Sequence, residues 1–223
     1  MNINNIKKYN DNIIKDIDNI INENNINNKF KYLNEIYNKM INNNSNKIYF
    51  NGKYVGGLNN DKREGKGIMY YKNGDKYEGE WKNDKIEGKG IYYYNNGDRY
   101  EGEWKNEKMD GKGIYYYNSG NRYEGEFKND QKEGKGLYYY INGDLYEGEW
   151  INNKREGKGI YYYNKGQWKG DIYEGEWKNS KREGKGIYYY NNGDRQMGDY
   201  LNDKQIGKHV TLRPNGTITL KNY

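Results

Sequence analysis

The sequence predicts a mainly β fold: an elongated antiparallel β-hairpin solenoid of about seven 23-residue repeats, with a short α-helical N-terminal segment. Three observations lead to this prediction. One string recurs along the chain, and its clearest copy, YEGEWKNDKIEGKGIYYYNNGDR, occupies residues 77–99. Side chains alternate in character within each copy, and a tight-turn signal closes it. Repetition at this period indicates stacked units, each of which packs on its neighbours.

Composition favours a folded chain whose apolar area is carried by aromatic rings. Hydrophobic residues make up only 33%, but aromatic residues make up 17%, and 29 of them are tyrosines. Disordered chains are poor in aromatic residues. The net charge of +6 comes from interspersed acids and bases, so it permits contact with acidic lipids or proteins without requiring it. The absence of cysteine excludes disulfides, thiolate metal sites and cysteine nucleophiles.

Residues 1–46 are rich in Asn, Ile and Lys, and we predict that they form a separate segment. Apolar residues recur at helical spacing over residues 13–21 and 30–41. A helical hairpin that caps the first repeat is the preferred interpretation. The alternatives are a marginal segment, because asparagine is a poor helix former, and helices that pair with another chain.

The start of the chain is polar, and no stretch reaches the roughly 18 apolar residues that a bilayer-crossing helix needs. We therefore expect neither a signal peptide nor a membrane-spanning helix. The expected location is cytoplasmic, with attachment to the surface of a membrane or to the cytoskeleton as a further option.

The repeat array is predicted to occupy residues 47–223, after a lead-in strand at 47–52. The fifth repeat is four residues longer than the others, and the seventh is degenerate. In the seventh, Gln196 takes the first tyrosine place, Tyr200 the tryptophan place, and His209 a glycine place. The six regular repeats begin at Tyr54, Tyr77, Tyr100, Tyr123, Tyr146 and Tyr173.

Each repeat is predicted to be a β-hairpin. Over residues 77–81 the rings and the glycine face one way and two glutamates face the other. A polar loop, residues 82–88, leads to a second strand at 89–94, and the Asn-Gly-Asp turn at 96–98 leads to the next repeat. The expected core is a ladder of Tyr, Trp and Ile. The glycines of the first strand sit between rings, and the Gly-Lys-Gly glycines make room for a ring one repeat away.

The pattern YxGxW, then GxG, then a turn glycine, at a period of 23, resembles the MORN repeat (membrane occupation and recognition nexus). The resemblance extends from Tyr54 to about Tyr223. It departs at Leu58, in the long fifth repeat and in the degenerate seventh. The structural repeat residues that carry it are Tyr77, Gly79, Trp81, Gly88, Gly90 and Gly97.

The resemblance implies an elongated, twisted hairpin solenoid associated with scaffolding, protein binding, dimerisation and anionic-lipid binding. In relatives that are enzymes, catalysis resides in a separate domain, and we expect no such domain in these residues.

Chemical sites are not expected from the residues themselves. His209 is the sole histidine and is predicted to be a surface residue of a degenerate repeat. The Gly-Lys-Gly segments lack the Lys-Ser/Thr ending of a phosphate loop. The glutamates recur in every repeat, which fits a solvated face. We therefore expect no enzyme activity, no catalytic residue, no cofactor, no metal, no nucleic-acid partner and no small-molecule substrate.

Two functional hypotheses remain. In the first, the array is a non-catalytic scaffold that binds a protein or a second copy, because the tripled tyrosines place rings on both faces of the sheet. In the second, it is a peripheral membrane module that binds anionic phospholipids through basic and aromatic residues. Basic loop tips could serve an acidic partner or simply solubility. The candidate partner-binding aromatics are Tyr92, Tyr115, Tyr138, Tyr161 and Tyr188.

Overall fold

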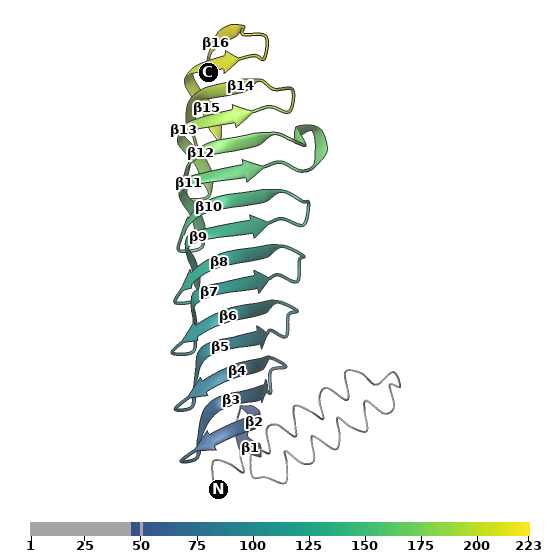
Figure 1. The fold of residues 1–223 in the computed structure, drawn as a ribbon, viewed down its shortest axis with the longest axis vertical. Coiled ribbons are helices and arrows are strands. Elements are labelled where there is room, and N and C mark those ends of the chain that lie inside the picture. The colour runs from purple at the N-terminus through teal and green to yellow at the C-terminus, as the bar shows by residue number, and fades with distance from the viewer. Residues whose placement is uncertain (1–45, 50) are drawn as a thin grey trace, which may run out of the picture.

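The computed structural model describes residues 46–49 and 51–223, and these residues form one open sheet. Its 16 strands follow one another in sequence order. Figure 1 shows the hairpins stacked along a single axis, with β1 and β16 at opposite ends. This arrangement confirms the predicted β-hairpin solenoid. The elements are β1 (Asn46–Tyr49), β2 (Gly52–Asn59), β3 (Lys62–Tyr71), β4 (Lys76–Lys82), β5 (Lys85–Tyr93), β6 (Arg99–Lys105), β7 (Lys108–Tyr116), β8 (Arg122–Lys128), β9 (Gln131–Tyr139), β10 (Leu145–Ile151), β11 (Lys154–Tyr162), the 3-10 helix η1 (Gly166–Trp168), β12 (Ile172–Lys178), β13 (Lys181–Tyr189), β14 (Arg195–Leu201), β15 (Lys204–Leu212) and β16 (Ile218–Asn222).

The predicted N-terminal helices fall on residues 1–45, which lie outside the described part of the chain. The sheet begins with β1 at Asn46, which pairs with β2, so a lead-in strand does precede the first repeat.

The two strands of each hairpin are joined by a turn of only two residues, not by the seven-residue loop that polarity suggested. In the second repeat, Asn83 and Asp84 have φ values of 49° and 67°. Two consecutive positive φ values define a type I′ turn, whose twist matches that of the strands it joins. Asparagine tolerates this conformation. The strands therefore continue through most of the polar segment, and its side chains become strand side chains.

The second connection links one repeat to the next and follows the prediction. Gly97 has a φ of 90°. Its N–H donates to the carbonyl of Tyr94 at 3.0 Å, and the N–H of Tyr94 donates to the carbonyl of Asp98 at 3.0 Å. The side chain of Asn96 accepts from the N–H of Asp98 at 2.9 Å. Glycine and asparagine supply what this turn needs, namely a positive φ and a local side-chain acceptor.

The strand glycines let a tyrosine ring lie directly on the backbone. Gly79 and Gly90 face each other across β4 and β5, and the strand register shifts just after Gly79. A Cβ atom on either glycine would collide with the ring of Tyr77. The sequence-based reason for these glycines is therefore right, but the ring belongs to the same repeat, not to a neighbouring one. Glycine is required at position 88 for a different reason: its φ is 77°, and the side chain of Glu80 lies where a Cβ atom would be.

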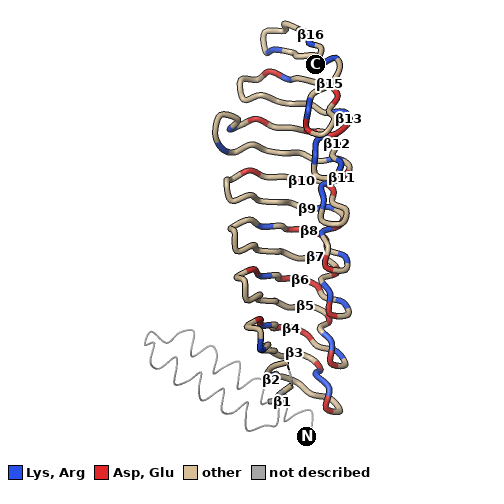
Figure 2. Tube along the Cα trace, turned by 180° about the vertical axis from the view of Figure 1, so that it is seen from behind, with Lys and Arg blue, Asp and Glu red and all other residues tan. Residues whose placement is uncertain are grey.

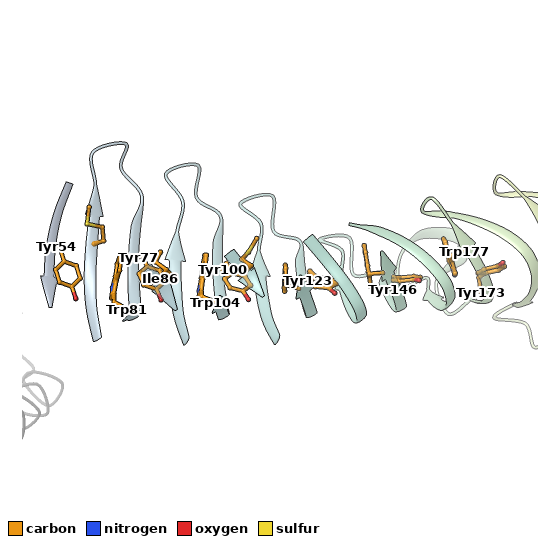
Figure 3. Packing of buried hydrophobic residues seen from close by; sticks show 14 of the residues in the cluster. Tyr54, Tyr77, Trp81, Ile86, Tyr100, Trp104, Tyr123, Tyr146, Tyr173 and Trp177 are labelled. Carbon is orange, nitrogen blue, oxygen red and sulfur yellow. The ribbon is translucent and has the colours of Figure 1, made fainter. Parts of the chain in front are cut away.

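The buried rings form a continuous ladder along the axis (Figure 3). Tyr77 is fully buried and lies edge-on between Trp81 of its own repeat, at 5.2 Å between ring centroids, and Trp104 of the next, at 5.6 Å. Its hydroxyl donates to the carbonyl of Glu80 at 3.1 Å. The indole N–H of Trp104 donates to the carbonyl of Gly90 at 3.3 Å. Each edge-to-face pair adds about 0.5–1.5 kcal/mol beyond burial, so every repeat stabilises its neighbour.

The aliphatic part of the predicted ladder needs correction. Ile91 pairs in register with Glu78 and Glu101, so the row that includes Ile91 lies on the face opposite the rings. The buried non-aromatic residues that do join the ring ladder are Met69, Ile86 and Met109, and the last two follow type I′ turns.

The seventh repeat also forms a hairpin, β14 and β15, and its histidine is not a surface residue. His209 is fully buried, and a Cβ on Gly198 would collide with its imidazole. The imidazole occupies the space over the strand glycine that a tyrosine ring occupies in the other repeats. Gln196, in the tyrosine place, is buried beside it.

Candidate functional site

The five candidate tyrosines lie on the ring face, which we define as the face that carries Tyr77, Trp81 and their equivalents. Tyr92 pairs with Tyr77 in register and lies 5.9 Å from Trp104, measured between ring centroids. It is half-buried and lies 4.5 Å from Tyr94, whose ring is 5.8 Å from Tyr115. The first and third tyrosines of each run thus form a second ladder beside the buried one. The ring edges of this second ladder are partly exposed, so contact between these tyrosines and a partner stays a prediction.

The hydroxyls of this ladder tie adjacent repeats together. Tyr92 donates to the carboxylate of Asp75 at 2.9 Å, and the backbone N–H of Asn95 donates to the same carboxylate at 2.8 Å. Partial burial acts to raise the pKa of Asp75, but the hydrogen bonds from Asn95, Tyr92 and Asn73 outweigh it and lower that pKa. Burial, and then the bond to Asp75, raise the pKa of Tyr92. Equivalent bonds join Tyr115 to Asp98, Tyr161 to Asp144 and Tyr188 to Asp171.

The middle tyrosine of each run lies on the opposite face, and sequence reasoning did not single it out. In repeats two to four, the cation that stands just before the repeat lies over a middle tyrosine ring. Lys76 lies 4.2 Å from the ring centroid of Tyr93, and Arg99 lies 4.2 Å from that of Tyr116. Such contacts are worth about 0.5–1 kcal/mol at exposed sites. The middle tyrosines are Tyr70, Tyr93, Tyr116, Tyr139, Tyr162 and Tyr189.

A groove with a volume of about 2200 Å³ runs along this second face, from β2 to β15. We call this face the groove face. Facing glycine pairs such as Gly79 and Gly90 form its floor, and a row of aliphatic side chains equivalent to Ile91 runs beside them. Rows of glutamate and lysine complete it. Lysine lies directly opposite glutamate in one pair of rows, as Lys89 lies opposite Glu103.

Carboxylates outnumber lysines among the residues that line the groove, although the chain as a whole is basic. Eleven carboxylate side chains and seven lysines line it, which gives a net charge of −4, whereas the whole chain carries +6. The excess acid comes from the glutamate row that includes Glu78. The cross-strand neighbours of Glu78 are Ile68 and Ile91, but Lys76 of its own strand contacts it at 3.2 Å. Glu101 and Glu124 are likewise contacted by arginines that stand outside the lining. Figure 2 shows both signs of charge along the whole length of the sheet.

The basic residues next to the type I′ turns divide between two environments. The residue directly after the turn is exposed, as Lys85 is. The next residue turns onto the ring face: Arg63 lies 4.0 Å from the ring of Trp81, and Arg155 lies 4.3 Å from that of Trp177. Lys132 occupies the same place among four rings, and burial lowers its pKa to about 8. The predicted row of exposed basic side chains at the turns therefore contains only the first of these two residues, because the second packs against the rings.

Within residues 46–49 and 51–223, no group of three or more His, Asp or Glu side chains is placed to hold a metal ion. His209 lies alone, and its Nε2 donates to the backbone carbonyl of Asp199 at 3.0 Å. No helix in the same residues has the length and apolar character to cross a membrane.

Stacked hairpins, a buried ring ladder and a groove along one face define a single-layer β-repeat protein with an elongated surface. The MORN repeat model matches six consecutive segments: 54–76, 77–99, 100–122, 123–145, 146–168 and 173–195. These segments make up more than half of the chain, which therefore belongs to the MORN-repeat family. The model leaves out residues 169–172, where the fifth repeat is extended, and the seventh hairpin.

Solved structures with weak overall similarity were also found. The chain is 16% identical to the TCP domain of SAS-4 (dCPAP) from Drosophila melanogaster, solved in complex with a proline-rich motif of dSTIL; 71% of this chain and 84% of that chain are covered, with a TM-score of 0.45. The wild-type TCP10 domain of CPAP from Danio rerio is 14% identical, with 79% of this chain and 93% of that chain covered and a TM-score of 0.30. No curated protein sequence matches the chain significantly.

Proposed function

We propose that this MORN-repeat protein is a non-catalytic protein-interaction module, and that its partner lies as an elongated segment along the groove. The observation that carries the proposal is the groove itself, which is continuous over the repeats and combines an aliphatic row with charged rows. Contact surfaces of this kind combine apolar area with charges that orient the partner. The residues that define the MORN repeat in this chain are packing residues, so they support a binding role and supply no reaction chemistry.

The tyrosine ladder on the ring face is the competing contact surface. Four of the five candidate rings are half-buried, and Tyr188 is buried. Several hydroxyls are engaged by turn aspartates, as in the bond from Tyr115 to Asp98. This leaves ring edges, not whole rings, for a partner. The groove offers unfilled volume, so it is favoured as the primary site.

Anionic-lipid binding is the alternative function. The groove lining carries more carboxylates than lysines, and the cations that contact Glu78, Glu101 and Glu124 are already paired, so the groove offers lipid phosphates little positive charge. Cations such as Lys85 at the turns, and the exposed side chain of Trp168, lie outside the groove lining and would have to carry such binding. Co-sedimentation with phosphatidylserine vesicles over a salt series tests this function separately.

Site-specific crosslinking tests the protein-binding function. The chain contains no cysteine, so one introduced thiol can carry a benzophenone label at one chosen place. We expect Lys112→Cys, in the groove, to crosslink to a partner protein, and Lys128→Cys, exposed at the hairpin edge, to do so much less. Ser119→Cys, exposed in the turn beside the tyrosine ladder, reports on the ring face. Equal labelling from all three positions, or none, would contradict a groove-bound partner.

A further inference from the structure

The repeats differ at one place on the groove face, and the difference follows a rule. In repeats two to four, the residue just before the repeat is a cation that contacts the glutamate two residues later. Lys76 lies 3.2 Å from Glu78, and Arg122 lies 3.7 Å from Glu124. The same cation also lies over a middle tyrosine, as Arg122 lies 4.1 Å from the ring centroid of Tyr139. In repeats two to four, the chain thus places one of its own cations beside a middle tyrosine and a glutamate.

Repeats five and six lack this cation. Leu145 and Ile172 stand in its place, and they flank Tyr162 on both sides in register. Among the middle tyrosines of the described repeats, Tyr162 alone has two aliphatic cross-strand neighbours. Tyr139 keeps Arg122, and Tyr189 keeps Arg195 at 5.8 Å.

The carboxylates at this place also lack basic neighbours across the strands. Glu147 has Leu137 and Ile160 opposite it, and Glu174 has Ile160 and Ile187. The two glutamates are separated by two strand spacings, or roughly 9–10 Å. Burial, and then the charge and hydrogen bond of Glu147, raise the pKa of Tyr162, with a smaller effect of the charge of Glu174. The Glu174 carboxylate accepts a hydrogen bond from the hydroxyl of Tyr189 at 3.1 Å, which a carboxylate can keep while it accepts further bonds.

We propose that the Tyr162 patch, formed by Leu145, Glu147, Ile160, Tyr162, Ile172 and Glu174, binds one arginine side chain of the partner segment that lies in the groove. This inference rests on the proposed protein-binding function and names the chemistry that the groove recognises. The three groove-lining members of the patch are Glu147, Ile160 and Glu174.

Arginine fits this patch better than an uncharged residue does. Its aliphatic stem covers apolar area while its head stays at the polar rim. Its planar group stacks on an aromatic ring and carries five N–H donors, enough to reach Glu147 and Glu174 together. The internal precedent is the equivalent set of groups in the preceding repeats: Arg99 lies over the ring of Tyr116 and contacts Glu101 at 3.9 Å. Arg122, also a cross-strand neighbour of Tyr116, lies over Tyr139 and contacts Glu124.

Methyl NMR with a defined probe tests the inference. The probe is a nonapeptide of Gly, Thr and Val with one central arginine, and its control carries citrulline, which has the same shape without the charge. We expect the arginine peptide to shift the methyl resonances of Leu145, Ile160 and Ile172. The Ile91 methyl, which lies between strands that carry Lys76 and Arg99, serves as the internal reference. The citrulline peptide should leave all of them unchanged.

Two double variants change the patch in opposite directions. Leu145→Arg with Ile172→Arg introduces the cation that the other repeats carry, so it should fold and should reduce the shift at Ile160 at least tenfold. Arg99→Leu with Arg122→Leu exposes Tyr116, Glu101 and Glu124 around Ile114, and should create a second responding methyl at Ile114. Thermal melts of both variants report that the array is intact.

Three results would overturn the inference: no shift in the unmodified protein, equal shifts with citrulline, or undiminished shifts at Ile160 in the filled variant. The protein-binding function is decided independently, because crosslinking from Lys112→Cys in the groove does not depend on which side chain the partner presents. A crosslink that persists when the Tyr162 patch is filled, together with absent peptide shifts, would retain the function and reject the patch.

Discussion

The Nε2 of His209 lies 3.0 Å from the backbone carbonyl of Asp199 and donates to it. In the regular repeats a tyrosine hydroxyl makes this bond to the equivalent carbonyl, as Tyr100 does to Glu103 at 3.0 Å. The seventh repeat has therefore moved its ring to the partner strand: glutamine replaces tyrosine on β14, and histidine replaces glycine on β15. The imidazole also continues the ladder, 5.5 Å from Tyr200 and 5.0 Å from Tyr223 between centroids.

This exchange predicts strong coupling between Gln196 and His209. His209→Gly should cost about 2–4 kcal/mol of unfolding free energy, because it leaves a cavity and an unpaired carbonyl. Gln196→Tyr alone should also destabilise, since its ring would meet the imidazole over Gly198. The double variant recreates the regular repeat and should regain most of the loss. Urea denaturation of the four proteins gives the coupling energy, and simple additivity of the two single effects would contradict the exchange.

The turn aspartates predict a loss of stability in acid. The pKa values of Asp75 and Asp98 are lowered because hydrogen bonds to each carboxylate outweigh the opposing effect of burial. A carboxyl whose folded pKa lies below its unfolded value stabilises the fold above the ordinary pKa of 3.8, and this contribution is lost as the pH falls through the folded pKa. Thermal melts from pH 6 down to about pH 2 should show this decline, and Asp98→Asn should make it shallower.

Repeat three supplies a natural control for this effect. Its turn carries Asn121, which accepts from the N–H of Ile141 at 2.8 Å. Asn121→Asp gives Tyr138 a charged acceptor, so it should add about 1 kcal/mol near neutral pH and steepen the loss in acid. A stability increase that persists unchanged at low pH would mean that the carboxylate is not its source.

Lys132 predicts a rise in stability at alkaline pH. Burial lowers its folded pKa to about 8 from an ordinary 10.5. Between these values the unfolded chain binds more protons than the folded one, so stability rises with pH. Lys132→Met should stabilise the protein at pH 7 by about 1–2 kcal/mol, reduced by the ring contacts that the cation loses. It should also flatten the alkaline rise. Lys135→Met, exposed in the groove, should leave that rise in place.

Two kinds of strand glycine, those under a tyrosine ring and those with a positive φ, should respond differently to alanine. Gly90→Ala places a Cβ against the ring of Tyr77 and should cost about 3 kcal/mol, at the upper end for overpacking. Gly65 has a φ of 72° and nothing within 4 Å of its ideal Cβ position. Gly65→Ala should therefore cost only about 1 kcal/mol, from backbone conformation alone. Equal losses in the two denaturation curves would show that ring contact is not the reason for Gly90.

The hairpins and much of their core could be predicted because their signals are local. Alternation over residues 77–81 separates Tyr77 and Trp81 from the two glutamates, whatever the neighbouring strand does. The Asn-Gly-Asp turn is likewise set by the conformations its own residues tolerate. The type I′ turn is not evident from polarity, because Asn83 and Asp84 lie within a longer polar stretch. Its signal in the sequence is that two consecutive residues tolerate a positive φ.

Features that depend on register could not be predicted in this way. Alternation along β5 places Ile86 and Ile91 on opposite faces, but only pairing with β4 and β6 shows that Ile86 joins the ring ladder and that Ile91 lines the groove. The register shift after Gly79 changes which residues face each other beyond it. The substitutions at Leu145 and Ile172 are visible in the sequence, but they acquire a meaning only once Tyr162 is known to lie between them.

The sequence by itself determined the repeat period, the presence of two strands in each repeat, the turns between repeats and the side of each first strand that carries the buried rings. Each of these follows from backbone preferences and alternation within a few residues. The tertiary structure alone decided what each side chain faces: Glu80 over Gly88, Lys132 among four rings, His209 in a tyrosine's place, and Tyr162 without a cation. The physical reason is that these neighbours belong to different strands, and only pairing, bulge and twist bring them together.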